Sequence, residues 1–309
     1  EIVMPAKALS RSLFAYSNWD SAPVLAGLAH FAFVLGLFFA FDRLPWLAFV
    51  ALGLVYALSI SWNINGIAHN HIHNPYFRWQ PLNRAFSMLL SLTMGFTQTD
   101  YHYVHLRHHV GNSDRPSADG KTLDPLSIYR CGRDGKPENV WRYTFLSYFR
   151  DSPTQSLAQA VNTKRRADII WSRIELVGVL LFTAALAYFN WRFVLCLIPF
   201  YYLGHSLSSL NGFYEHYRGN PDLPIAWGVS TYNRLYNWLW FYNGYHAEHH
   251  YRPRQHWTKM KELHAQIAED QKRAEVRVIG TCHALGFLEP SHPPHMWDDW
   301  RGNGRTKID

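Results

Sequence analysis

The sequence predicts an all-α membrane protein with four transmembrane helices in two hairpins and a cytosolic helical cap that carries groups of histidines. Three observations lead to this prediction. Long uncharged segments occur in two pairs, histidines recur at helical spacing between and after these pairs, and few basic residues fall in the turns within the pairs. Of the 309 residues, 48% are hydrophobic, which leaves ample apolar surface to bury or to expose to lipid.

The first pair of spans is expected at about residues 22–41 and 45–65. Val24 to Phe41 and Pro45 to Trp62 are 18 residues each and contain no formal charge. At about 1.5 Å per residue, such a helix crosses most of a hydrocarbon layer that is roughly 30 Å thick. Residues 42–44 are expected to form the turn of this helical hairpin.

The second pair is expected at about residues 171–189 and 193–212, with residues 190–192 as the turn. Arg43 and Arg192 are the basic residues in the two turns, and the remaining 28 of 30 lysines and arginines lie elsewhere. Basic residues concentrate on the cytosolic side of membrane proteins. The turns should therefore face away from the cytosol, and the multi-pass chain should present its remaining segments to it.

The segments outside the spans are expected to form a cap and a tail within one integral-membrane domain, residues 1–309. The cap comprises residues 66–170 and 213–270. Apolar residues recur at helical spacing from Trp257 to Ile267 and predict an amphipathic helix on the membrane or on the cap. Residues 271–309 are expected to be a polar tail.

Histidines in three motifs predict a metal centre. The motifs are HxxxH at residues 69–73 and HxxHH at residues 105–109 and 246–250, and a single histidine occurs at 216. Residues at i, i+3 and i+4 share one face of a helix, so each motif directs imidazoles to one side. The predicted ligands are His69, His73, His105, His108, His109, His216, His246, His249 and His250. Because one metal is satisfied by about four ligands, nine histidines indicate two metals.

Other residues argue against several classes of protein. The three cysteines, Cys131, Cys196 and Cys282, contain no CxxC pair, so an iron–sulfur site and a disulfide framework are not expected. The net charge of +7 has no nucleic-acid-reading motif beside it, and no nucleic-acid partner is expected. A zinc hydrolase or a metal transporter stays a minor alternative, although no HExxH motif is present and the histidines fall outside the spans.

The order HxxxH, HxxHH, HxxHH on a four-span chain resembles the membrane fatty acid desaturase and hydroxylase superfamily over about residues 20 to 265. The resemblance implies a di-iron centre of two iron ions, held by the histidines named above, which uses O2 as co-substrate to oxidise an unactivated C–H bond of a lipid chain. Desaturation of a fatty acyl chain is favoured. Hydroxylation of a lipid or alkane, and oxidative decarboxylation of a free fatty acid to a terminal alkene, are the alternatives.

Several residues near the motifs have undecided roles. His71 should point away from the face that carries His69 and His73, whereas His102 and His205 are weaker candidate ligands. Glu215 and Glu248 adjoin predicted ligands, so they either accept an imidazole N–H or are solvated carboxylates. Three asparagines that precede a histidine motif, Asn65, Asn211 and Asn243, fit a turn as well as a supporting role.

The substrate is expected to lie in a narrow apolar tunnel, for which three aromatic-rich segments are candidates: Phe31 to Phe41, Phe193 to Tyr202 and Tyr232 to Tyr245. No flavin, nicotinamide or haem domain accompanies the motifs, and the His292 to His295 segment is too slight to be one. A separate electron-transfer protein, such as a ferredoxin, rubredoxin or small haem protein with its reductase, is therefore expected. Its docking surface is predicted at Arg130, Arg133, Lys136, Arg252 and Arg254.

Overall fold

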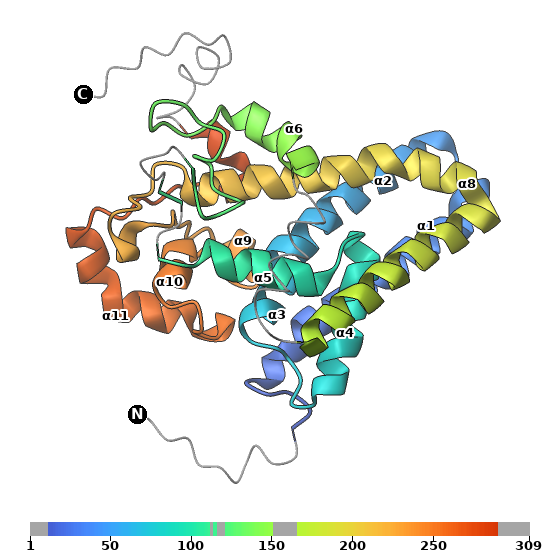
Figure 1. Cartoon of the computed structure of the whole chain (residues 1–309), viewed down its shortest axis with the longest axis horizontal. Helices are drawn as coiled ribbons and strands as arrows, with labels where there is room; N and C mark the ends of the chain where they lie inside the picture. Colours follow the sequence, from blue (N-terminus) through green and yellow to red (C-terminus); the bar gives the residue numbers. More distant parts are fainter. Residues whose placement is uncertain (1–11, 112–113, 116–120, 151–165, 290–309) are drawn as a thin grey trace.

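The computed structural model describes residues 12–111, 114–115, 121–150 and 166–289, and the regular elements of these residues are helices (Figure 1). Apart from isolated bridges of Phe14 with Phe77 and of Ser230 with Val278, the described ranges contain no strand. The predicted all-α class is therefore confirmed. The part of the expected tail beyond residue 289 lies outside the described residues.

The first two long helices follow the uncharged segments. η1 (Asn18–Asp20) leads into α1 (Ser21–Ala40), and η2 (Phe41–Arg43) joins α1 to α2 (Trp46–Trp62). The proline at position 45 precedes the first residue of α2, where a missing N–H costs nothing because that group has no partner inside a helix. Both helices are apolar all round, as expected of helices that face protein on one side and lipid on the other.

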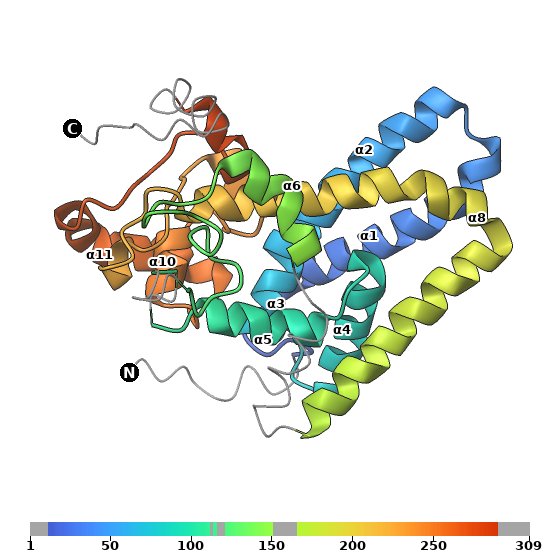
Figure 2. The same cartoon turned by 45° about the horizontal axis from the view of Figure 1, so that its top comes forward.

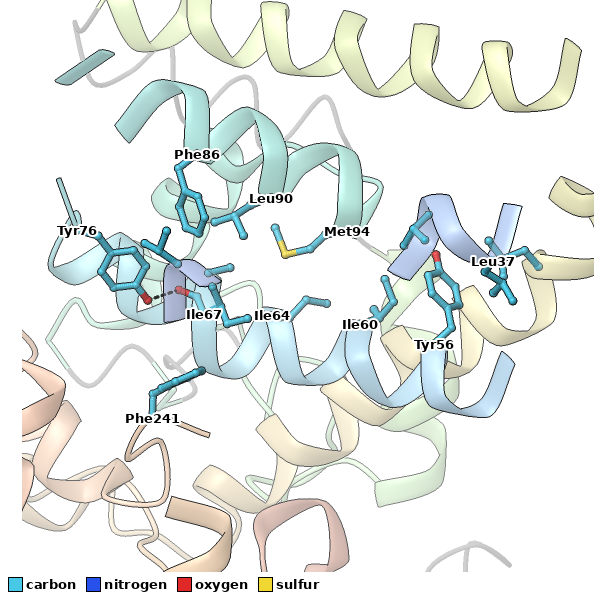
Figure 3. Packing of buried hydrophobic residues seen from close by; sticks show 14 of the residues in the cluster. Leu37, Tyr56, Ile60, Ile64, Ile67, Tyr76, Phe86, Leu90, Met94 and Phe241 are labelled. Atoms are coloured by element: carbon cyan, nitrogen blue, oxygen red, sulfur yellow. Dashed lines mark hydrogen bonds between the residues drawn. The ribbon is translucent and has the colours of Figure 1, made fainter. Parts of the chain in front are cut away.

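The end of α2 changes its winding directly before the first histidine motif. Residues Asn63–Ala68 form a π-helix, η3, which continues into α3 (His69–His73). A π-helix leaves main-chain carbonyls without their usual helical partners. Side chains supply substitutes here, since Tyr76 Oη donates to the Ile67 carbonyl at 2.8 Å (Figure 3) and Gln98 Nε2 donates to the Ala68 carbonyl at 3.0 Å.

Two helices of the interior come next, α4 (Gln80–Met94) and α5 (Gln98–His108). Phe86, Leu90 and Met94 of α4 pack against α2 and η3 in the largest buried apolar cluster (Figure 3). α4 ends at Gly95, whose φ of 76° is a left-handed conformation that suits glycine. The Thr97 side chain then caps α5 by accepting a hydrogen bond from the Asp100 backbone N–H.

α8 (Arg166–His216) is one assigned helix with a sharp change of direction inside it (Figure 2). Asn190 has non-helical φ and ψ of −154° and 80°, so the helix has a first arm, residues 166–189, and a second arm, residues 191–216. The Asn190 side chain donates to Asp42 Oδ2 at 2.8 Å, which joins this bend to the turn between α1 and α2.

Three helical segments are long and apolar enough to cross a membrane: Asn18–Arg43, Trp46–His73 and Arg166–His216. Exposed apolar side chains on the third segment include Leu180, Leu181, Tyr188 and Phe189. Such exposure on a helix of this length is typical of contact with lipid.

The remaining elements lie around α5 and the second arm of α8 (Figure 1). They are α6 (Val140–Arg150), η4 (Pro224–Ala226), α9 (Arg234–Leu239), α10 (His246–Tyr251), η5 (Trp257–Lys259), α11 (Met260–Arg273) and η6 (His283–Leu288). The predicted amphipathic helix is present as η5 and α11, and its apolar face packs on the protein through Met260, Leu263 and Ile267. Residues 271–289, assigned to a tail from the sequence, include η6, in which His283 is fully buried.

Candidate metal centre

The nine histidines selected from the sequence lie together in two groups, each of which can hold a metal ion. The first group consists of His69, His73, His105, His109 and His249. The second group consists of His108, His216, His246 and His250. Within each group, one ring nitrogen per residue lies within 4.8 Å of the others. The structure brings every predicted ligand to the site, while ligation itself stays a prediction.

Helical phase explains how two short helices supply both groups. His105 of α5 and His109, which caps the end of α5, are four residues apart and face the first group, whereas His108 faces the second. α10 does the reverse, because His246 and His250 face the second group and His249 faces the first. Each HxxHH motif therefore contributes to both groups, which keeps the two groups adjacent.

The Nε2 atoms of the first group are too close together for hydrogen bonding alone to explain. His249 Nε2 lies 2.8 Å from His69 Nε2 and 3.0 Å from His109 Nε2. His105 Nε2 lies 3.0 Å from His109 Nε2 and 2.8 Å from His73 Nε2. An imidazole nitrogen has either one proton or one lone pair in the ring plane, so it cannot hydrogen-bond well to two such neighbours. Coordination of one cation by all of these lone pairs explains the short distances. Ligand atoms at right angles and roughly 2.1 Å from a metal are roughly 3 Å apart.

The second group contains buried nitrogens that have no partner among the described residues. They include Nδ1 of His216 and of His246 and both ring nitrogens of His250. His216 Nε2 and His246 Nε2 are 3.1 Å apart. A buried polar atom left unpaired costs about 1–3 kcal/mol. A metal ion bound inside the group would satisfy one nitrogen of each ring, so this donor set also fits a metal ion.

The protonation of the motif histidines suits metal binding. Burial, and then the neighbouring imidazoles, lower the pKa of His109, His249 and His250 well below the ordinary value. The rings are therefore neutral near pH 7, and a neutral ring offers the lone pair that a metal needs. Imidazole binds iron, copper, nickel and zinc, so the ligand type alone does not select among them.

Three carboxylates lie behind the second group. Asp124 Oδ2 accepts a hydrogen bond from His108 Nδ1 at 2.6 Å, Asp114 Oδ2 is 3.9 Å from His216 Nδ1, and Glu215 Oε1 is 3.7 Å from His246 Nδ1. A carboxylate on the outer nitrogen orients the ring and makes the inner nitrogen more basic. Burial lowers the pKa of His108, but Asp124, Asp114 and Glu215 together outweigh burial, and the net shift is upward.

Asp114 and Asp124 were missed by the sequence reasoning. They belong to the polar run from Gly111 to Asn139, which has no helical or strand periodicity that would predict where a side chain points. Asp124 precedes Pro125 and accepts a hydrogen bond from the Leu126 N–H at 2.7 Å, so the dipeptide marks a turn. The sequence therefore could have predicted a turn at Asp124. It could not have predicted that the Asp124 side chain contacts His108.

Glu215 and Glu248 are both buried, so the alternative that they are solvated surface carboxylates is wrong. Glu215 Oε1 accepts from Asn211 Nδ2 and Asn243 Nδ2, each at 2.7 Å, and these asparagines thus hold the carboxylate beside His246. Glu248 instead accepts from Ser230, Tyr232 and His264 at 2.7 to 2.8 Å. Glu248 therefore joins α10 to α11. Within the described residues, it forms no ion pair with a histidine of either group.

The other candidate residues lie outside both groups. His71 is buried between Tyr76 and Phe86, where its Nδ1 accepts from the Tyr76 N–H at 3.4 Å, as its helical phase predicted. His102 packs beside the Tyr103 ring. His205 Nε2 lies 3.2 Å from the Met94 carbonyl, to which it can donate. Asn65 donates to the Ser61 carbonyl at 2.9 Å and forms part of a cavity wall.

A cavity of about 580 Å³ lies beside both groups. His69, His105, His108, His216 and His246 form one part of its wall. Cavities of a few hundred cubic ångströms are typical of sites for small organic ligands. Of the three aromatic segments predicted to form a tunnel, only Phe193 to Tyr202 contributes to this wall, through Tyr201. The other two segments do not line this cavity, and Phe38, Phe41 and Phe241 instead pack in the apolar core.

Comparisons with known proteins match the chain to a protein family and to curated relatives. A family model described as fatty acid desaturase matches residues 44–281, a range that contains all nine histidines. Curated relatives from Arabidopsis thaliana and Oryza sativa subsp. japonica are both named "Sphingolipid delta(4)-desaturase DES1-like". Each is 24% identical over 215 residues, which is 68% of this chain. The aligned region spans about 60% of the length of these relatives.

Proposed function

The chain belongs to the fatty acid desaturase family, and from that premise we propose that it is a membrane oxidoreductase that oxidises an acyl chain of a lipid with O2. The observation that carries this proposal is the position of the two histidine groups at the wall of one cavity. Nine imidazole donors in two groups suit two iron ions, and the cavity provides room for an acyl chain beside them.

In this proposal the chain's own residues hold and orient the reacting parts. The first group would hold one iron ion and the second group the other. Asp124 orients His108 through a hydrogen bond, and Glu215 lies 3.7 Å from the outer nitrogen of His246. The bound iron would supply the oxidising power with which O2 removes hydrogen from an unactivated C–H bond. The cavity wall positions one part of the chain and keeps water away from it.

Desaturation is the reaction that we favour, because both relatives are named as desaturases. Removal of one hydrogen from each of two adjacent carbons forms the C=C bond. Together with two electrons and two further protons, those hydrogens reduce O2 to two water molecules. The named relatives also point to a sphingolipid as one candidate substrate to test.

We further propose that the protein crosses the membrane four times as one domain, because the bend at Asn190 divides α8 into two apolar arms. The hydrogen bond between Asn190 and Asp42 supports a position of both turns on the same side. The histidine groups would then lie on the opposite, cytosolic side, among residues 66–170 and 213–270.

A separate electron carrier would supply the two electrons. We propose that it docks on the basic residues around the cap, of which Arg133, Lys136, Arg252 and Arg254 are exposed and Arg130 is partly exposed. Small electron carriers are commonly acidic, and charge attraction speeds their encounter with a basic surface. The exposure of these basic side chains supports the proposal that the carrier docks there.

The test is to express the protein, measure bound metal, and analyse lipids and volatile hydrocarbons by mass spectrometry. We expect about two irons per chain and new unsaturated lipids. Hydroxylated lipids or terminal alkenes would replace desaturation by one of its alternatives. A protein that binds one zinc and oxidises no lipid would refute the proposed function.

A further inference from the structure

The cavity beside the histidine groups extends to the surface of the long helices. The wall away from the histidines includes Tyr148 and Phe149 of α6, Leu176 of the first arm of α8, and Tyr201 and His205 of the second arm. Phe149 is 69% exposed and Tyr148 is 39% exposed, although both line the cavity. The cavity therefore reaches the surface at the carboxyl end of α6, which lies against the second arm (Figure 2).

The surface around this opening is apolar. On α6, Phe145 and Leu146 are exposed next to Phe149, and on the first arm an exposed stripe continues through Ile170, Ile174 and Val177. Those three residues are spaced at i, i+4 and i+7, so they share one face of the helix. Exposed apolar surface of this kind is typical of contact with lipid rather than with water.

The opening also lies at the depth of the hydrocarbon. Leu176 is 14 residues and Tyr201 is 11 residues from the bend at Asn190. At about 1.5 Å per residue these positions are about 21 Å and about 16 Å from the bend. Both distances are shorter than the roughly 30 Å thickness of the hydrocarbon layer. Exposed Tyr188 and Trp191 beside the bend fit the membrane surface, where such rings are enriched.

Aromatic contacts hold α6 at this position. The Tyr202 hydroxyl donates to the Phe145 carbonyl at 2.6 Å, the Phe149 ring is 5.4 Å from the Tyr202 ring, and the Tyr148 ring is 5.1 Å from the His205 ring. These contacts involve the cavity wall itself. A displacement of the end of α6 would therefore change the width of the opening.

We propose that the opening between α6 and the two arms of α8 is a lateral portal through which an acyl chain enters the cavity from the bilayer. This inference rests on the proposed oxidation of an acyl chain at the histidine groups. It names the substrate class as a lipid that is dissolved in the membrane, in contrast to a thioester that arrives from water. Phe149 forms the outer wall of the portal and Tyr148 its inner wall.

Photo-crosslinking tests the route without requiring turnover. The full chain is placed in phosphatidylcholine nanodiscs with a trace of phosphatidylcholine that carries a diazirine near the end of one acyl chain. After irradiation, we expect labelled peptides that contain Tyr148, Phe149 and Leu176, in iron-loaded and iron-free protein alike. Labelling confined to lipid-facing positions such as Leu180 and Leu181 would overturn the portal, as would labelling of the cavity only by a diazirine acyl thioester supplied in water.

A blocked variant provides the second measurement. Phe149→Cys, in a chain whose three native cysteines are replaced by alanine, is modified with a bulky maleimide. We expect at least a tenfold loss of cavity labelling. The matched control is Leu146→Cys, an exposed position on the same helix outside the cavity wall, which should keep its labelling after modification. Equal labelling of both modified proteins would refute the portal, whereas labelled protein that oxidises no lipid would refute only the proposed function.

Discussion

His105 and His250 illustrate what a single residue contributes to the metal centre. His105 Nε2 has two histidine nitrogens within 3.0 Å, and both nitrogens of His250 are buried without a partner in the described structure. We expect His105→Ala, His109→Ala, His246→Ala and His250→Ala each to abolish turnover and to lower bound iron, because no neighbouring donor replaces the lost nitrogen. Iron per folded chain is measured by elemental analysis.

His71→Ala is the matched control, since His71 is also a buried histidine of the first motif but contacts Tyr76 and Phe86 instead of either group. It should keep its iron and most of its activity. Full iron content in His105→Ala would contradict the assignment of the first group.

Asp124 provides a second test at this scale, because it hydrogen-bonds the outer nitrogen of His108. We expect Asp124→Asn to weaken metal binding by about 10-fold to 100-fold, as found when acceptors behind metal ligands are removed. Iron retained against increasing chelator measures the effect. Asp134→Asn alters an exposed carboxylate of the same loop region and should leave retention unchanged. Equal retention in both variants would show that Asp124 does not support the metal.

The sequence was sufficient to predict that the nine histidines lie together, because the positions of residues on a helix follow from its 3.6-residue period. It was not sufficient for Asp114 and Asp124, since loops have no such period. It also could not distinguish the environment of Glu215 from that of Glu248. Both follow the same pattern beside a histidine, yet only Glu215 lies near a histidine of the second group.

Among the elements, the π-helix η3 depends on side chains from other helices. Tyr76 is fully buried and its hydroxyl donates to the Ile67 carbonyl. We expect Tyr76→Phe to lower stability by about 1–3 kcal/mol, because the buried carbonyl loses its donor. A lower thermal midpoint in detergent measures the change. Tyr188→Phe, at a tyrosine that is 85% exposed, should have no effect, and an equal decrease in both proteins would contradict this role.

The long helices were predictable from uncharged segments, but their detailed limits were not. The second pair was expected at residues 171–189 and 193–212, whereas α8 runs from Arg166 to His216 and departs from helical geometry at Asn190. The Asn190 side chain accepts from the Phe193 N–H at 3.1 Å, which begins the second arm. The hydrophobic pattern predicts where the apolar part of a helix ends. The helical backbone of α8 continues beyond that point and brings His216 to the second group.

For the whole molecule, the contact between Asn190 and Asp42 gives a test of topology. Single cysteines at Arg43 and Arg192, both exposed, should react in intact cells with a reagent that cannot cross membranes, because both turns face outward in the proposed topology. A cysteine at Lys136 should react only after the membrane is opened. Protection of both turns together with reaction at Lys136 would reverse the proposed orientation.

The proposed requirement for an electron carrier is tested on the whole molecule. With NADPH, O2 and lipid, we expect sustained turnover only when a reductase and a carrier protein are added. The rate should fall with increasing salt, because salt screens the attraction to the basic surface. Arg133→Glu combined with Lys136→Glu should reduce that salt dependence. Multiple turnover without added protein would refute the need for a carrier, and a rate independent of salt would refute the basic docking surface.

The contact between His69 and His249 spans 180 positions of the chain. During synthesis, the first group stays incomplete until His249 has left the ribosome, long after α1 and α2 have been made. The proposed metal centre is thus assembled at a late stage and joins segments from the first and last thirds of the chain. In iron-starved cells, we expect newly made chains to be degraded more quickly, so iron supply would set how many molecules survive as well as how fast each one works.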